Sequence, residues 1–340
     1  MEDMFNRLPN PLISHILSFL PTKEAASTSV LSKRWRLLFA SVTNLDFESD
    51  EESPSFVEFV NRVLALGGND SINRFSLIFT DYPDPDTVTP WILNVLRRGV
   101  SELELSVSDY PLPPEIFVSK TLAKLKLGGG DGLSFSTDVK KVSLPKLKTL
   151  EIESVVFEED GVGFAKLLSG CPVLEELLTV ESDEEIGWDS LPGLLKNCPN
   201  LETLVFKGLV HKSTKGCGNM CACKPLKNPS YLSSSAVKVL KIILSVHIDD
   251  DGMEEEPIKH FLEKMPRLEQ LVVYFNESYE PSVFELSKKL QSVSTIASPK
   301  CNLQVISQNL SLSSTLPCAL TKKWSAPPNE EYTWFLKAVT

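Results

Sequence analysis

The sequence predicts an α/β protein in which a short all-helical N-terminal module is followed by a solenoid with a curved parallel sheet and return helices. Three observations support this prediction. A short apolar motif recurs along most of the chain, and apolar residues follow helical spacing within the first 46 residues. The length of 340 residues also exceeds that of one ordinary domain, so several structural units or a long repeat array are expected.

The N-terminal module, residues 1–46, is predicted from two runs of apolar residues at helical spacing. The first run begins near Pro11, which fits a first helical turn, and ends at Pro21. The second run extends from Lys23 to Phe39 and interleaves apolar with basic side chains. Two or three helices of this length cannot bury all of this apolar surface among themselves, so part of it should contact a neighbour or a partner.

Residues 47–70 are predicted to form an acidic, proline-containing joint and a first helix, and repeats follow over residues 71–235. The repeated motif is apolar-x-x-apolar-x-apolar, although one unit ends at Thr179. Its first positions lie 22 to 36 residues apart, at Ile72, Val100, Leu122, Leu147, Leu174, Leu201, Val237 and Leu268. This pattern and period are typical of leucine-rich repeats (LRRs), each of which contributes one short strand.

Helical segments that return from one strand to the next are expected before several strands. Thr89 and Pro90 fit the N-cap and the first position of one such helix. Residues 164–168, 191–196 and 257–265 occupy the same place in later repeats. The motif stops after residue 307, and residues 308–340 are expected to form a partly disordered tail.

Composition and charge exclude several classes of protein. The chain carries 34 Lys and Arg residues against 45 Asp and Glu residues, for a net charge of −11. No nucleic-acid partner is expected, because phosphate binding needs clustered cations. The N-terminus lacks the pattern of a secretory signal, and no stretch approaches the length of a membrane span. We therefore expect an intracellular protein, nuclear and/or cytoplasmic, without a membrane partner and with seven reduced cysteines.

The stretch LPNPLISHILSFLPTKEAASTSVLSKRWRLLF, which begins at Leu8, resembles an F-box. The rest of the chain, to about residue 307, is similar to plant F-box/LRR proteins that carry a C-terminal FBD region. Stretches that support this similarity include LLSGCPVLEELL at 167–178 and IKHFLEKMPRLEQLVV at 258–273. The resemblance implies that residues 1–46 are an F-box and that residues 236–307 are an FBD-like region that continues the solenoid.

An F-box docks on the Skp-type adaptor of SCF ubiquitin ligases, so the resemblance implies an adaptor-binding surface. The predicted contact residues are Leu8, Pro9, Ile13, Ile16, Leu17, Leu20, Pro21, Val30, Leu31 and Trp35. Leu17, Val30 and Leu31 fit either a partner interface or the interior. A competing interpretation is that the whole apolar stripe packs on the first repeat.

The cysteines offer the strongest candidate for metal chemistry. Cys217, Cys221 and Cys223, with His211 upstream, form the kind of ligand set that zinc favours. Their spacing matches no standard zinc finger, so an ordinary reduced loop is the favoured interpretation and no metal site is predicted. Cys171 and Cys198 recur at the repeat period and are predicted to be small buried residues of the solenoid.

No nucleophile, phosphate-loop or calcium-loop motif is recognisable, so neither a cofactor nor catalysis is expected. The resemblance implies a non-catalytic substrate-recognition subunit of an SCF-type ubiquitin ligase. Its partners would be the Skp-type adaptor, through it the cullin and RING subunits, and a target protein held by the repeats. The acidic loop 249–256 suits a basic target segment. The alternative is an LRR scaffold, or adaptor-bound binding protein, that does not promote degradation.

Overall fold

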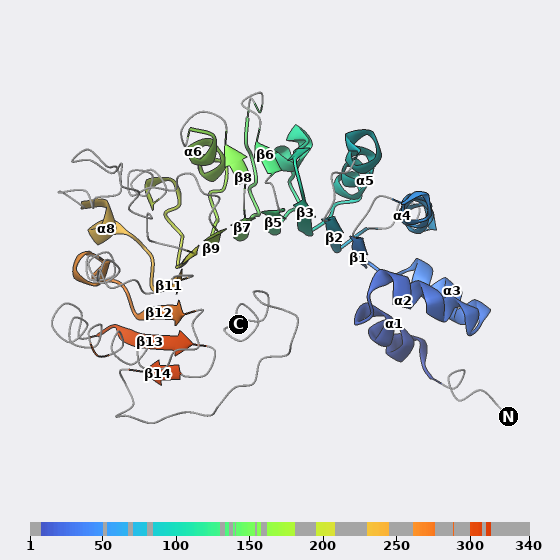
Figure 1. The fold of residues 1–340 in the computed structure, drawn as a ribbon, viewed down its shortest axis with the longest axis horizontal. Coiled ribbons are helices and arrows are strands. Elements are labelled where there is room, and N and C mark those ends of the chain that lie inside the picture. The colour runs from blue at the N-terminus through green and yellow to red at the C-terminus, as the bar shows by residue number, and fades with distance from the viewer. Residues whose placement is uncertain are drawn as a thin grey trace. The chain divides into compact units, whose positions relative to one another are not determined.

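The chain divides into two compact units, Met1–Leu201 (unit 1) and Glu202–Thr340 (unit 2). A computed structural model of the protein is shown in Figure 1. It describes residues 8–49, 53–66, 71–79, 84–129, 133–135, 139, 141–153, 155–157, 162–180, 195–207, 230–244, 261–275, 288, 300–307 and 311–313. The loop 249–256 and most of the predicted tail therefore lie outside the described residues.

The N-terminal module contains the predicted helices, which are α1 (Asn10–Ser18), α2 (Thr22–Ser27), the 3-10 turn η2 (Thr28–Val30) and α3 (Lys33–Ala40). Pro11 lies in the first turn of α1, where its missing N–H removes no helical hydrogen bond. Ser32 caps α3, because its hydroxyl accepts a hydrogen bond from the backbone N–H of Trp35 at 3.3 Å. Local sequence signals therefore define these helix ends.

The main sheet of unit 1 is parallel, and its strands follow chain order. They are β1 (Asn44–Ser49), β2 (Arg74–Phe79), β3 (Glu102–Val107), β5 (Lys124–Gly128), β7 (Thr149–Glu153) and β9 (Glu176–Val180). From β2 onward, each of these strands begins two residues after a first position of the repeated motif, as β2 does after Ile72. The first positions are themselves buried. The predicted LRR fold is confirmed.

The sheet starts earlier than predicted. Residues 44–49 form β1 and pair in register with β2, where the sequence predicts the end of the helical module and an acidic joint. Val42, Leu45 and Phe47 fit the repeated motif, and Leu45 and Phe47 are buried. Since α3 ends at Ala40, the first strand follows the helical module almost directly.

Helices return along one side of the unit 1 sheet (Figure 1). They are α4 (Pro54–Leu66), α5 (Pro85–Arg97), the 3-10 helix η3 (Pro114–Val118) and α6 (Val162–Ser169). The helix α6 confirms the prediction over 164–168. The predicted cap at Thr89 is wrong, because Asp84 caps α5 by accepting a hydrogen bond from the N–H of Asp86 at 3.0 Å. Pro90 consequently lies inside the helix.

A second parallel sheet, which the sequence did not predict, lies on the helix side of the main sheet (Figure 1). Its strands are β4 (Tyr110–Pro111), β6 (Leu133–Phe135) and β8 (Val155–Phe157). Tyr110 is fully buried, and its hydroxyl shares a hydrogen bond of 2.6 Å with the hydroxyl of Thr89. The rings of Phe117 and Phe135 meet edge to face, with centroids 4.7 Å apart. These contacts are part of the core of the middle repeats.

Unit 2 continues the same strand pattern. Its described elements are β10 (Thr203–Lys207), α8 (Ser230–Ser234), β11 (Val239–Leu244), β12 (Gln270–Phe275), β13 (Asn302–Ser307) and β14 (Ser311–Ser313). The first three strands begin two residues after Leu201, Val237 and Leu268. β14 pairs antiparallel with β13, so residues 311–313 are strand rather than the tail that the sequence predicts.

Candidate functional site

Large apolar side chains are exposed mainly on the N-terminal module. Among the described residues, seven large hydrophobic side chains are exposed, and five of them lie between residues 12 and 37. These five are Leu12, Phe19, Val30, Leu31 and Leu37. Single exposed apolar residues are common, but their concentration in one short module indicates a protein-docking surface.

Three of the predicted contact residues lie in the interior instead. Ile13 and Leu17 are fully buried and Trp35 is 3% exposed, and with Ala25 and Phe39 they form the core of the module. Ile13, Leu17 and Trp35 therefore help to hold the module together, and a contact of these three residues with an adaptor stays a prediction. The stripe also does not pack entirely on the first repeat, as the competing interpretation requires, because part of it is exposed.

The other seven predicted contact residues remain available at the surface. Pro9, Pro21, Val30 and Leu31 are exposed, whereas Leu8, Ile16 and Leu20 are half-buried. Their role in adaptor binding stays a prediction.

The sequence prediction missed three exposed apolar residues, Leu12, Phe19 and Leu37. Leu12 on α1 and Phe19, the residue that caps its C-terminal end, are seven residues apart and both exposed, while Ile13 and Leu17 of the same helix are buried. The spacing that groups Leu12 with Phe19 is present in the sequence. Periodicity alone could not show which of the two apolar faces is turned inward.

Arg34 ties the start of the module to α3. Its Nε donates a hydrogen bond to Oδ1 of Asn10 at 2.6 Å, and its Nη2 donates to the backbone carbonyl of Leu8. A guanidinium is suited to such paired bonds, because its donors are fixed in one plane. Leu8 and Pro9, two of the predicted contact residues, are thereby held beside α3.

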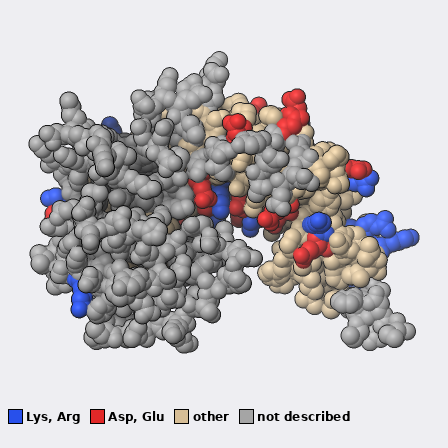
Figure 2. Space-filling view, viewed as in Figure 1, with Lys and Arg blue, Asp and Glu red and all other residues tan. Residues whose placement is uncertain are grey.

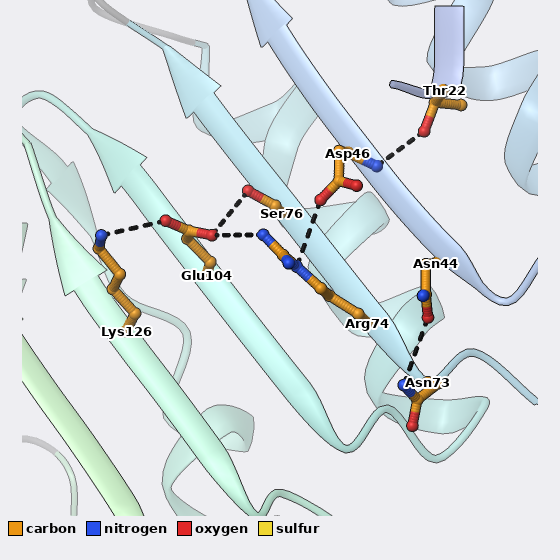
Figure 3. Close-up of polar contacts among 8 residues, drawn as sticks. All are labelled: Thr22, Asn44, Asp46, Asn73, Arg74, Ser76, Glu104 and Lys126. Atoms are coloured by element: carbon orange, nitrogen blue, oxygen red, sulfur yellow. Dashed lines mark hydrogen bonds and ion pairs between the residues drawn. The ribbon is translucent and has the colours of Figure 1, made fainter. Parts of the chain in front are cut away.

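Thr22 joins the helical module to the sheet (Figure 3). Its hydroxyl accepts a hydrogen bond from the backbone N–H of Asp46 at 2.7 Å, and the side chain is 2% exposed. This bond links α2 to β1, in addition to the short chain connection between α3 and β1. The module and the first repeat are therefore packed together as parts of unit 1.

A chain of ion pairs crosses the outward face of the unit 1 sheet (Figure 3). Arg74 on β2 contacts Asp46 on β1 at 3.3 Å and Glu104 on β3 at 3.2 Å. Lys126 on β5 contacts both Glu104 and Glu151, the latter on β7, at 3.2 Å each. We call these five residues the ladder. Carboxylates and cations alternate along it. Glu104, Lys126 and Glu151 are register partners on neighbouring strands, whereas Arg74 lies two residues before Ser76, the register partner of Asp46 and Glu104, and contacts both carboxylates diagonally.

Burial and neighbouring charges shift the pKa values of the ladder carboxyls in different directions. Burial raises the pKa of Glu104, but Lys126, Ser76 and Arg74 outweigh it and hold that pKa below its usual value. Burial raises the pKa of Glu151 above its usual value, and attraction to Lys126 does not offset this. The pKa of Asp46 is likewise raised by burial in spite of Arg74. The two cations therefore stabilise the three carboxylates incompletely.

The proposed metal ligands His211, Cys217, Cys221 and Cys223 lie outside the described residues. Within the described ranges, no group of three or more His, Cys, Asp or Glu side chains could hold a metal ion. The same ranges contain no helix with the length and apolar character needed to cross a bilayer.

Cys171 and Cys198 are buried, as the sequence predicts. Burial raises the pKa of both thiols to about 12, so they remain protonated and serve as small core residues.

Two family models match parts of the chain. The model of the F-box domain matches residues 5–46. A model described as "FBD-associated F-box protein At5g56370, LRR repeats" matches residues 88–188. Among solved structures, the leucine-rich repeat-containing protein LegL7 from Legionella pneumophila covers 82% of this chain and 79% of its own, at 16% identity and a TM-score of 0.30.

Three relatives from Arabidopsis thaliana span nearly the whole chain. The F-box/LRR-repeat protein At3g59200 is 46% identical over 98% of this chain and 94% of its own length. The F-box/LRR-repeat protein At3g59210 is 40% identical over 94% and 98% of the two chains. The putative F-box/FBD/LRR-repeat protein At3g59240 is 32% identical over 91% and 90%. With an F-box at its N-terminus, repeat strands after it and relatives of this similarity, the chain belongs to the plant F-box/LRR-repeat family.

Proposed function

We propose that this chain is the substrate-recognition subunit of an SCF-type ubiquitin ligase. The F-box would dock on a Skp-type adaptor, and through it on the cullin and RING subunits, while the repeats hold a target protein. The observation that carries the proposal is the concentration of exposed apolar side chains on the F-box, where Phe19 is 73%, Leu37 74% and Val30 87% exposed.

These side chains can contribute much of the binding energy of such a contact. Burying a large apolar side chain contributes about 1.5–3 kcal/mol, and a few such anchors often dominate an interface. The buried core of Ile13, Leu17 and Trp35 supports the docking surface by fixing α1 and α3. Arg34 adds to this support, because it holds Leu8 and Asn10 against α3 before any partner arrives.

The proposed contribution of the chain to ubiquitin transfer is proximity. Tethering a target beside a ubiquitin-charged enzyme converts an encounter between two molecules into a reaction within one assembly. On this proposal the chain itself makes and breaks no bonds. It would act inside the cell, in the nucleus, the cytoplasm or both.

A pull-down with purified Skp-type adaptor tests the proposal. The wild-type chain is compared with Phe19→Ser/Val30→Ser/Leu37→Ser, in which all three substituted side chains are exposed, so the fold should be retained. The matched control is Leu66→Ser/Val118→Ser, which removes exposed apolar side chains from the repeats. We expect the F-box variant to lose adaptor binding and the control to keep it.

Three results would count against this function. Failure of folded wild-type protein to bind the adaptor would favour the non-degradative scaffold. Equal loss of binding in both variants would show that the contact does not depend on the F-box surface. The wild-type chain could also bind the adaptor while the F-box variant fails to raise the level of any bound partner in cells. That combination would favour a scaffold as well.

A further inference from the structure

The outward face of the unit 1 sheet carries a second candidate interface. Alternate residues of each strand point away from the core, and helices α4, α5 and α6 lie on the other side of the sheet (Figure 1). Acidic and basic side chains are interleaved along the strip occupied by these strands (Figure 2). The charged positions of this face are Asp46, Glu48, Arg74, Glu102, Glu104, Lys124, Lys126, Glu151, Glu153 and Glu176. Seven of them are acidic and three are basic, so the face has a net negative charge.

Two of the three cations of this face, Arg74 and Lys126, are already engaged in ion pairs with its carboxylates. Arg74 contacts two ladder carboxylates, and Lys126 contacts two as well. Within the described part of the chain, no ion pair involves Glu48, Glu102 or Glu153. These three carboxylates therefore remain available to cations from another molecule.

One row of the face has uncharged positions between two carboxylates. From β1 to β5 the row is Glu48, Ile78, Ser106 and Gly128, which are register partners of one another. Glu153 on β7 lies beside Gly128, since a Cβ built on that glycine would be 3.1 Å from the Cβ of Glu153. The row is thus acidic at both ends, and the three positions between the carboxylates, Ile78, Ser106 and Gly128, are uncharged.

Strand spacing sets the distance between these two acidic ends. Four strand steps of about 4.8 Å separate β1 from β7, or roughly 19 Å. An extended segment advances about 3.4 Å per residue, so it crosses this distance in about six residues.

We propose that this row binds an extended basic segment of a target protein, with cations about six residues apart that contact Glu48 and Glu153. This inference deepens the proposed function, on which it rests, by specifying the chemistry of the target. The ladder beside the row supports the same polarity, since its three carboxylates exceed its two cations. The negative charge of the face would attract a basic partner, and the two acidic ends of the row would orient it across the strands.

The test uses the full chain and fluorescein-labelled synthetic peptides, with binding followed by fluorescence anisotropy. The probe carries two Arg-Arg pairs about six residues apart in a Gly/Ser background. The first control peptide has the same composition with its four arginines adjacent, and the second replaces Arg by Glu at the original spacing. We expect the spaced basic peptide to bind at least about threefold more tightly than the clustered one, and the preference to weaken as salt rises.

Matched protein variants locate the contact. Glu48→Gln/Glu153→Gln should abolish the preference for the spaced peptide. Glu115→Gln/Glu263→Gln removes the same charge from other positions and should leave the preference intact. Equal effects of the two double variants would overturn the proposal, as would equal binding of the two basic peptides or tighter binding of the acidic one.

Zero-length carbodiimide cross-linking identifies independently which carboxylates contact the peptide. It uses the same probe with Lys in place of Arg. Cross-links on Glu48 and Glu153 would support the proposal, and cross-links confined to other carboxylates would overturn it. No adaptor is present in either assay. A negative peptide result with a positive adaptor pull-down would therefore reject this inference alone and leave the proposed function intact.

Discussion

Arg34 and Asn10, 24 residues apart in the chain, are joined by a hydrogen bond of 2.6 Å from the guanidinium Nε to Oδ1. The same guanidinium also donates to the carbonyl of Leu8, so one side chain holds the segment that precedes α1. The exposed start of the F-box is consequently ordered by α3.

The first prediction concerns this anchor. Arg34→Lys replaces a planar group by a single ammonium that cannot reproduce both bonds, and we expect a loss of about 0.5–1.5 kcal/mol in stability. Adaptor affinity should fall as well, because Leu8 and Pro9 lose their fixed position. Urea unfolding and adaptor titration measure the two effects. Arg36→Lys, an exposed change on the same helix, is the control, and an equal loss in that variant would contradict the prediction.

The second prediction separates core from surface in the F-box. Trp35→Ala should destabilise the module by about 3–5 kcal/mol, because it opens a cavity in a small core. Phe19→Ser should change stability by less than about 0.5 kcal/mol, because that side chain is already in water. Hydrogen exchange over residues 8–40 resolves the difference. Equal protection in the two variants would mean that Trp35 does not support the module.

The third prediction concerns the joint between the module and the sheet. Thr22→Val keeps the shape of the side chain but removes the acceptor for the N–H of Asp46, which costs about 1–3 kcal/mol for a buried donor. Faster amide exchange at Asp46 and loss of stability in unit 1 should follow. Thr43→Val, an exposed threonine close to β1, should leave both quantities unchanged.

The fourth prediction is a pH dependence of the ladder. The pKa of Glu104 lies below its ordinary value of 4.5 in the folded protein. Its carboxylate therefore stabilises the fold above that pH, and the contribution is lost as the pH falls through the lowered value. Glu104→Gln should cost about 1–2 kcal/mol near pH 7, and the difference from wild type should shrink under acidic conditions.

Glu151 provides the control of opposite sign. Its pKa is raised in the folded state, so the folded protein takes up the proton before the unfolded chain does. Stability from this group increases as the pH falls through the raised value. Glu151→Gln should therefore cost less than Glu104→Gln near neutral pH. Thermal unfolding of the three proteins across the pH range checks both signs, and a pH-independent difference for Glu104→Gln would be inconsistent with them.

The fifth prediction concerns cysteine reactivity. With a pKa of about 12, the thiols of Cys171 and Cys198 are almost entirely protonated near neutral pH, and both are buried. The pKa of Cys301 is raised by burial to about 11. Iodoacetamide should leave all three unmodified in the folded protein and label them after denaturation, as peptide mass spectrometry will show. Rapid native labelling of Cys171 would contradict its place in the core.

The repeat strands could be predicted because the LRR motif itself marks where each strand begins. An apolar residue such as Ile72 or Val100 precedes each strand of the unit 1 main sheet by two residues. β1 escaped prediction although Val42, Leu45 and Phe47 fit the same motif, because the acidic residues after it suggest a joint. The strands of the second sheet are two or three residues long and contain no complete period.

The exposed apolar surface of the F-box could be predicted only in part. Apolar periodicity identified the correct helices, but Ile13 and Leu12 are adjacent in sequence and face opposite environments. Which face turns inward depends on how α1 packs on α3, and that contact is between residues distant in the sequence. The ladder also needed the fold, because its members are about 20 to 30 residues apart and meet only through strand register.

Only a short connection separates α3 from β1, and Thr22 is hydrogen-bonded to Asp46. The F-box is therefore held at one end of the unit 1 sheet, at β1. Each strand after β1 lies about 4.8 Å farther from the F-box than the strand before it. Repeat number is therefore also a measure of distance. A target bound across β7 would be presented about 10 Å farther from the F-box than one bound across β3. Choice of repeat, more than flexibility of a linker, would then select which lysines of a target come within reach of ubiquitin transfer.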